Sequence, residues 1–257
     1  MNAWIVSLLL LLAQAQGTQS ARQLMDRVNK RSAWRDLRGQ IEMVLEQRSG
    51  GRRVRKLEMW SMKNAAGESR MLMRFSEPPD VRGTSFLQIE HKAAEDDRRL
   101  FLPALRRVQR ISASGKKGAF MSSDFSYYDI GPPELDDWKL EFGGTQKVGD
   151  TECRVVVGLP ASKKVSADTG YSRVEWLVDE KRLVIMGARY YDKDGVLFKR
   201  LDVRKIDNVK GTPFATHMVM TNLLTGHESS MKFSHLETDT GLEEQFFTER
   251  NLRRIAR

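Results

Sequence analysis

The side chains that could do metal or acid–base chemistry are few and widely spaced in this sequence. There are four histidines, His91, His217, His227 and His235. On one continuous strand His227 and His235 would lie roughly 27 Å apart, at about 3.4 Å per residue, so they cannot bind one ion together. Cross-strand pairing with His217 stays open. Because no ligand-like spacing occurs, we expect structural or surface roles for the histidines and no metal site.

Motifs for nucleophilic, phosphate or dinucleotide chemistry are missing from the sequence. The segment 115–118, Gly-Lys-Lys-Gly, lacks the Ser or Thr that follows in a phosphate loop. Cys153 lies in a segment typical of a half-buried strand, which indicates inert packing. A hydrolase would need a nucleophile and a base close together, and His91, His217 and Asp124 are the only loose candidates. We therefore expect no catalytic residues, no cofactor and no enzyme.

Methionine is the first positive signal, with twelve in 257 residues. Several form same-face pairs on expected strands, such as Met71 with Met73 and Met218 with Met220. Met is flexible and polarizable, so a sheet face built from it can fit acyl chains; ordinary core packing and, more remotely, Cu(I) ligation are the alternatives. The residues predicted to line an apolar cavity are Met71, Met73, Phe75, Phe86, Leu100, Leu102, Met218 and Met220.

A run of basic residues is the second signal. Residues 98–117 contain seven Lys or Arg and no acidic residue, alternating with apolar side chains that must be buried. Arg106, Arg107 and Arg110 are candidates for contacting lipid headgroups or a membrane partner. Asp124 could instead pair with one of these arginines and make the segment structural, because Arg binds carboxylate and phosphate with the same fork geometry.

Composition and the N-terminal residues restrict the class of protein. Lys and Arg number 43 against 34 Asp and Glu, giving a net charge of +9, and 40% of residues are hydrophobic, which excludes disorder. Residues 3–13 are almost continuously apolar and end in Ala13-Gln14-Ala15, a pattern typical of a signal peptide rather than a bilayer span. A buried N-terminal helix is the alternative. We expect cleavage near Ala15, with residues 1–15 removed and 16–257 forming one exported domain, which disfavours nucleic acid as the partner of the basic charge.

The expected elements are mostly strands. One amphipathic helix is predicted over 21–31, and 103–111 and 133–138 are further helix candidates. Period-2 patterns and Gly-bearing turns predict strands over 41–45, 54–62, 71–75, 84–91, 98–102, 140–142, 153–159, 173–178, 184–191, 196–203, 214–222 and 228–236. This succession indicates one mainly β domain, an antiparallel sheet or barrel, rather than a βαβ array.

Three segments carry a family resemblance: RFSEPPDVRGTSFL at 74–87, LFLPALRRVQRI at 100–111 and FMSSDFSYYD at 120–129. They resemble the outer-membrane lipoprotein-sorting proteins, and within these a LolA-like branch of exported proteins. The resemblance runs from about residue 74 to the C-terminus. It implies a strongly curved antiparallel sheet, or half-open β-barrel, with short helices on its concave side and an apolar cavity for lipid or lipoprotein acyl chains. It also implies an RND-type inner-membrane transporter as a partner.

The sequence therefore predicts a periplasmic, monomeric carrier that binds acyl chains and moves a lipid or lipoprotein between membranes. The alternative is an accessory module that docks to an RND-type lipid exporter and carries nothing. A continuous apolar cavity discriminates the two, because a carrier needs one and a docking module can be packed solid.

Overall fold

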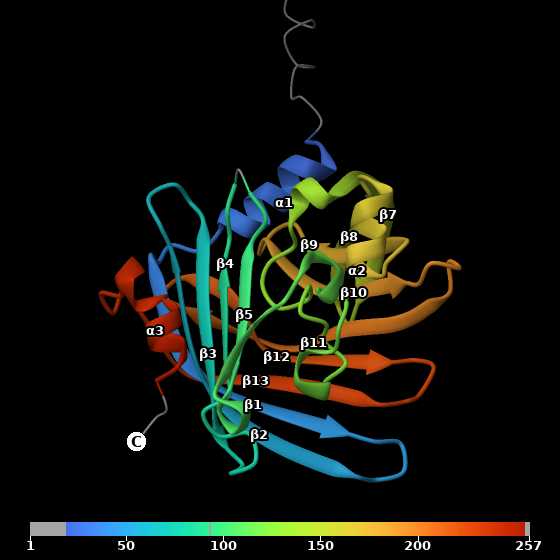
Figure 1. The fold of residues 1–257 in the computed structure, drawn as a ribbon. Coiled ribbons are helices and arrows are strands. Elements are labelled where there is room, and N and C mark those ends of the chain that lie inside the picture. Colours follow the sequence, from blue (N-terminus) through green and yellow to red (C-terminus); the bar gives the residue numbers. More distant parts are fainter. Residues whose placement is uncertain (1–18, 93, 255–257) are drawn as a thin grey trace, which may run out of the picture.

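One antiparallel sheet organises the protein in the computed structural model, which describes residues 19–92 and 94–254. Its thirteen strands run in the order β6-β5-β4-β3-β2-β1-β13-β12-β11-β10-β9-β8-β7. The two edge strands, β6 and β7, do not pair with each other, so the sheet is strongly curved but open (Figure 1). This confirms the predicted fold class. The predicted signal peptide, residues 1–15, lies outside the described residues.

The N-terminal half of the sheet is a meander that runs outward from the centre. Its strands are β1 (Asp36–Glu46), β2 (Arg52–Lys63), β3 (Ser69–Glu77), β4 (Ser85–Ile89), β5 (Asp97–Leu102) and β6 (Arg107–Arg110).

The C-terminal half runs back from the other edge until β13 pairs with β1. Its strands are β7 (Trp138–Val148), β8 (Thr151–Pro160), β9 (Arg173–Asp179), β10 (Val184–Tyr191), β11 (Leu197–Val209), β12 (Thr212–Asn222) and β13 (Glu228–Thr238).

The alternation of apolar residues sorts side chains onto two faces. On β2, Leu57 and Met59 are buried toward the concave face, where the main core lies. Phe101 of β5 and Leu72 of β3 point the other way into a second, smaller core. Both faces of the N-terminal half are thus covered, and the cover on each face comes from segments outside the sheet.

Three α-helices accompany the sheet in the described residues. The predicted helix forms as α1 (Ala21–Lys30), which begins at a capping box made by Ser20 and Gln23 and buries Leu24 and Met25 against the main core. Two others were not predicted, α2 (Lys163–Thr169) and α3 (Glu249–Leu252). The C-terminal segment that contains α3 covers the outer core with Phe247 and Leu252.

The two other helix candidates were wrong in extent. Within 103–111 only Pro103–Leu105 forms a single 3-10 turn, because Arg106 adopts a left-handed conformation (φ 47°) and the chain then pairs with β5 as β6. Within 133–138 only Leu135–Asp137 is helical, again as a 3-10 turn.

The connection between β6 and β7, residues 111–137, crosses from one sheet edge to the other over the concave face (Figure 1). We call it the plug. It buries apolar side chains in the main core: Phe120, Phe125, Tyr127, Tyr128, Ile130 and Leu135. A connection this long in a compact domain is uncommon and is usually functional.

Candidate functional site: an apolar cavity under the plug

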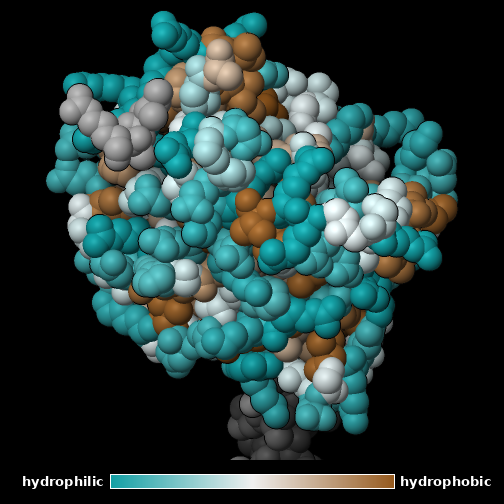
Figure 2. Space-filling model, turned by 90° about the horizontal axis from the view of Figure 1, so that it is seen from below, coloured by the Kyte–Doolittle hydropathy of each residue, from teal (hydrophilic) through white to brown (hydrophobic). Residues whose placement is uncertain are grey.

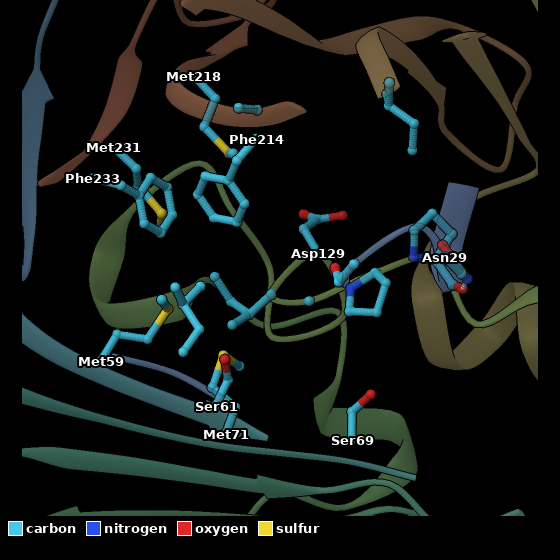
Figure 3. Close-up of a pocket in the computed structure, with 18 of the residues that line it drawn as sticks. Asn29, Met59, Ser61, Ser69, Met71, Asp129, Phe214, Met218, Met231 and Phe233 are labelled. Atoms are coloured by element: carbon cyan, nitrogen blue, oxygen red, sulfur yellow. Dashed lines mark hydrogen bonds between the residues drawn. The ribbon is translucent and has the colours of Figure 1, made fainter. Parts of the chain in front are cut away.

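A cavity of about 360 Å³ lies between the concave face, the plug and the end of α1. Figure 3 shows Met59 and Met71 on one side of it, with Met218, Met231 and Phe214 on the other. Its volume falls in the range of small-molecule sites, which is about 300–1,000 Å³. The sheet and plug therefore leave a space of ligand size instead of packing solid.

Strand register brings the methionines together. Met59 of β2 lies opposite Met73 of β3, and Met218 of β12 lies opposite Met231 of β13. Residues directly opposite in an antiparallel pair place their Cβ atoms about 4.5–5.5 Å apart, so these side chains share one surface. Thioether side chains from both halves of the sheet thus form an adaptable apolar wall.

The structure separates the eight predicted lining residues into two groups. Met71, Met73, Met218 and Met220 line the cavity. The others, Phe75, Phe86, Leu100 and Leu102, lie in or against the main core away from the cavity.

Phe120 of the plug accounts for this division. Its ring centroid lies 5.4 Å from that of Phe86 and 6.2 Å from that of Phe75, so the plug fills this part of the concave face. The cavity begins where the plug moves away from the sheet.

Several lining residues were missed by sequence reasoning. They include Met59, Met231, Phe214 and Phe233. Their alternation along each strand was visible, but the face they share depends on β13 pairing with β1, and no local pattern specifies that pairing.

A buried polar cluster fixes the plug beside the cavity. Lys199 of β11 lies 2.6 Å from the carboxylate of Asp129, and both side chains are almost fully buried. Tyr171 donates to the same carboxylate at 2.8 Å. Burial first, and then the charge of Asp129, raise the pKa of Tyr171 well above its usual range, so its hydroxyl stays a donor.

A second anchor involves Asp124, which does not pair with an arginine as one of our interpretations had it. His227 Nδ1 lies 2.5 Å from its carboxylate, and the Ser229 hydroxyl donates to the same oxygen at 2.6 Å. The plug reaches β13 here, the middle strand of the sheet, whereas Arg106 lies in the β5–β6 turn at one edge. Since the hydroxyl donates to the carboxylate rather than to the imidazole, the trio lacks the serine–histidine contact that activates a nucleophile.

The far end of the plug carries a carboxyl cluster. Glu134 pairs with the buried Arg98 of β5, which also lies 3.0 Å from Asp96. Asp137 accepts a hydrogen bond from Tyr128 at 3.0 Å. Burial, reinforced by Glu134, raises the pKa of Asp137 to about 6.

Arg106, Arg107 and Arg110 do not line the cavity. All three are exposed at the edge of the sheet, and none forms an ion pair within the described part of the chain. Arg106 and Arg107 follow Leu105, which is 66% exposed. They form a basic and apolar tip on the β5–β6 turn.

The described residues offer little for metal binding or thiol chemistry. No group of three or more His, Cys, Asp or Glu side chains there is arranged to hold a metal. Cys153 is buried, and burial raises the pKa of its thiol, which keeps it protonated. Within the same residues no helix is both long and apolar enough to cross a membrane.

Comparison with known proteins places this geometry in a family. A family model described only as an "Uncharacterized protein"-like group matches residues 67–254. A solved domain from Vibrio parahaemolyticus, assigned as an outer membrane lipoprotein-sorting protein, is 29% identical with a TM-score of 0.85, covering 91% of this chain and 98% of that one. The chain belongs to the family of that model, and it resembles the Vibrio lipoprotein-sorting domain in sequence and fold.

Two further solved structures share this fold. A DUF1329 family protein from Desulfovibrio piger is 28% identical, with a TM-score of 0.83 over 90% of this chain and 97% of that one. A LolA superfamily protein from Nitrosomonas europaea shares the fold at 18% identity, with a TM-score of 0.72 over 91% and 100% of the two chains. A search of curated proteins gave no match. The predicted resemblance to the lipoprotein-sorting family is confirmed.

Proposed function

We propose that this protein, which resembles a lipoprotein-sorting domain, is a periplasmic, non-enzymatic carrier that holds an acyl chain of a lipid or lipoprotein and moves it between membranes. The observation that carries the proposal is the methionine-walled cavity between the sheet and the plug. Burying each CH₂ group contributes about 0.8 kcal/mol, so one acyl chain can supply much of the affinity.

The hydropathy of the lower face favours a ligand held inside the protein rather than on that face. Figure 2 shows the lower face covered mainly by hydrophilic residues, with hydrophobic residues in small separate areas. A chain adsorbed on that face would stay exposed to water, whereas the cavity removes it from solvent.

We assign membrane or partner contact to Arg106, Arg107 and Arg110. An exposed leucine next to arginines that form no ion pair with any described residue suits an anionic membrane surface or an acidic site on a transporter of the RND type. Because these arginines lie away from the cavity, this role concerns docking and not the held chain.

Native mass spectrometry of the protein purified from its own compartment without detergent tests the carrier role. We expect a bound lipid or acylated protein at stoichiometric amounts, and uptake of a fluorescent acyl probe by emptied protein. Met218→Trp should fill the cavity and reduce probe uptake about tenfold or more, whereas Leu224→Trp, on an exposed turn, should not.

The alternative, a docking module without cargo, predicts another result. Repeated recovery of empty protein, with no probe uptake by either variant or by the unaltered chain, would overturn the carrier proposal in favour of that module.

A further inference from the structure

Positive charge collects at one rim of the cavity. Arg31, just after α1, and Lys63, the last residue of β2, both line the cavity and are partly exposed. Arg35 and Arg70 also line it, of which Arg70 is paired with Glu244 at 2.5 Å, and Asp129 is the only carboxylate among the described lining residues. That carboxylate is already paired with Lys199, so the rim carries a surplus of cations.

Among the residues that the structure describes, Arg31 and Lys63 have no carboxylate partner. Lys63 Nζ donates to the Asn29 carbonyl at 2.7 Å, which occupies one of its three donors. Arg31 donates from Nη1 to Val28 O at 2.8 Å and from Nε to Pro213 O at 3.2 Å. In residues 19–92 and 94–254 neither forms an ion pair, and Arg31 Nη2 has no hydrogen bond. Each cation therefore keeps free donors.

The two cations are also close enough to disfavour one another. Burial lowers the pKa of both groups, and the charge of Arg31 lowers that of Lys63 further. The charge of Glu90 acts on the pKa of Lys63 in the opposite direction and more strongly than that of Arg31, and the Glu90 carboxylate also accepts the backbone N–H of Ser69 at 3.0 Å. A bound anion would relieve this repulsion.

Helix capping explains only part of the arrangement. A basic residue at a helix C-terminus commonly bonds the last carbonyls, as Arg31 does with Val28. Capping does not account for Lys63, which comes from a different element and points at the same rim.

We propose that the cavity takes a single-tailed anionic amphiphile, with the acyl chain among the methionines and a carboxylate or phosphate bound by Arg31 and Lys63 together. This rests on the carrier function proposed above and adds the charge of the ligand. A cavity of about 360 Å³ is at the small end for ligand sites, which favours one tail over several. Two cations from separate elements supply charge-assisted hydrogen bonds to such a headgroup.

The test is a binding series at neutral pH with four ligands that share one tail: hexadecanoate, hexadecyl phosphate, hexadecanol and hexadecyltrimethylammonium. Each is titrated, below its micelle concentration, into the full mature chain after lipid removal. We expect at least one of the two anions to bind about tenfold or more tightly than hexadecanol. Comparing hexadecanoate with hexadecyl phosphate distinguishes a fatty acid headgroup from a phosphate headgroup.

The variant Arg31→Gln/Lys63→Gln should bring the Kd of the anions to that of hexadecanol and leave the hexadecanol Kd unchanged. Arg31→Lys/Lys63→Arg should restore anion preference, which separates charge from folding. Lys147→Gln, an exposed residue of β7 away from the cavity, is the matched control and should have no effect. Equal affinity for hexadecanol and both anions, or preference for the cation, overturns this inference while the carrier function stands. Binding of none of the four overturns the carrier function itself.

Discussion

Asp129 of the plug and Lys199 of β11 form an ion pair of 2.6 Å on the concave side of the sheet, at the edge of the cavity. The Lys199 ammonium also lies 4.9 Å from the ring centroids of Tyr171 and Tyr190. The pair ties the segment that covers the cavity to the strand that forms its floor.

Removing one partner of this ion pair should destabilise the protein strongly. We expect Lys199→Met or Asp129→Asn to lower the free energy of unfolding by about 3–5 kcal/mol, since each leaves a buried group without its partner. Urea denaturation measures the loss. The double variant should lose clearly less than the sum of the single losses, and additive losses would show that the two groups do not stabilise each other.

The second anchor predicts a smaller effect. Ser229→Ala removes the hydroxyl that donates to Asp124 and accepts its backbone N–H at 2.9 Å. We expect a loss of about 1–3 kcal/mol, because polar groups of a part-buried segment lose a partner. Faster hydrogen exchange at residues 120–126 should accompany it. Unchanged exchange there would argue against an anchoring role for Ser229.

Asp137 should make stability depend on pH. Its pKa is about 6 in the folded protein and about 4 when unfolded, so the folded state holds this proton more tightly. The contribution of this group to the free energy of unfolding therefore falls as pH rises from about 4 through 6. Asp137→Asn should remove that part of the dependence. The free energy of unfolding of the variant, relative to that of the original protein, should therefore increase as pH rises. A constant difference between the two across this window would contradict the assignment.

The C-terminal cover on the outer face should matter for the whole sheet. Phe247 is almost fully buried against the cluster that contains Leu72, Leu87 and Phe101. We expect Phe247→Ala to lower the free energy of unfolding by about 3–5 kcal/mol through the cavity it leaves. Phe142→Ala, at an exposed position of β7, is the control and should change stability little.

Local pattern was enough to predict most strands and the helix at 21–31, because apolar residues recur there with a period of 2 for strands and 3.6 for the helix. It failed for β6, where a left-handed Arg106 turned a short amphipathic segment into an edge strand. It also placed Phe75 and Phe86 with the cavity residues, since parity along a strand cannot show that Phe120 covers them.

Binding groups that depend on long-range contacts were beyond such patterns. Arg31 reads as an ordinary helix end, and Lys63 as the end of a strand. Only the fold brings the two to one rim, with the Asn29 and Pro213 carbonyls as their partners.

The pairing of β1 with β13 joins the first strand of the sheet to the last, with Met43 opposite Met231. Every other strand pair links neighbours along the chain, so each half of the sheet can form from local contacts. The pairing of β1 with β13 instead joins residues such as Met43 and Met231, which are 188 positions apart (231 − 43). Until β1 and β13 pair, a newly made chain presents two additional open strand edges and an uncovered thioether surface, both of which favour self-association. We expect the slow step of folding to be this pairing, and the chain to depend most on protection by chaperones during that interval.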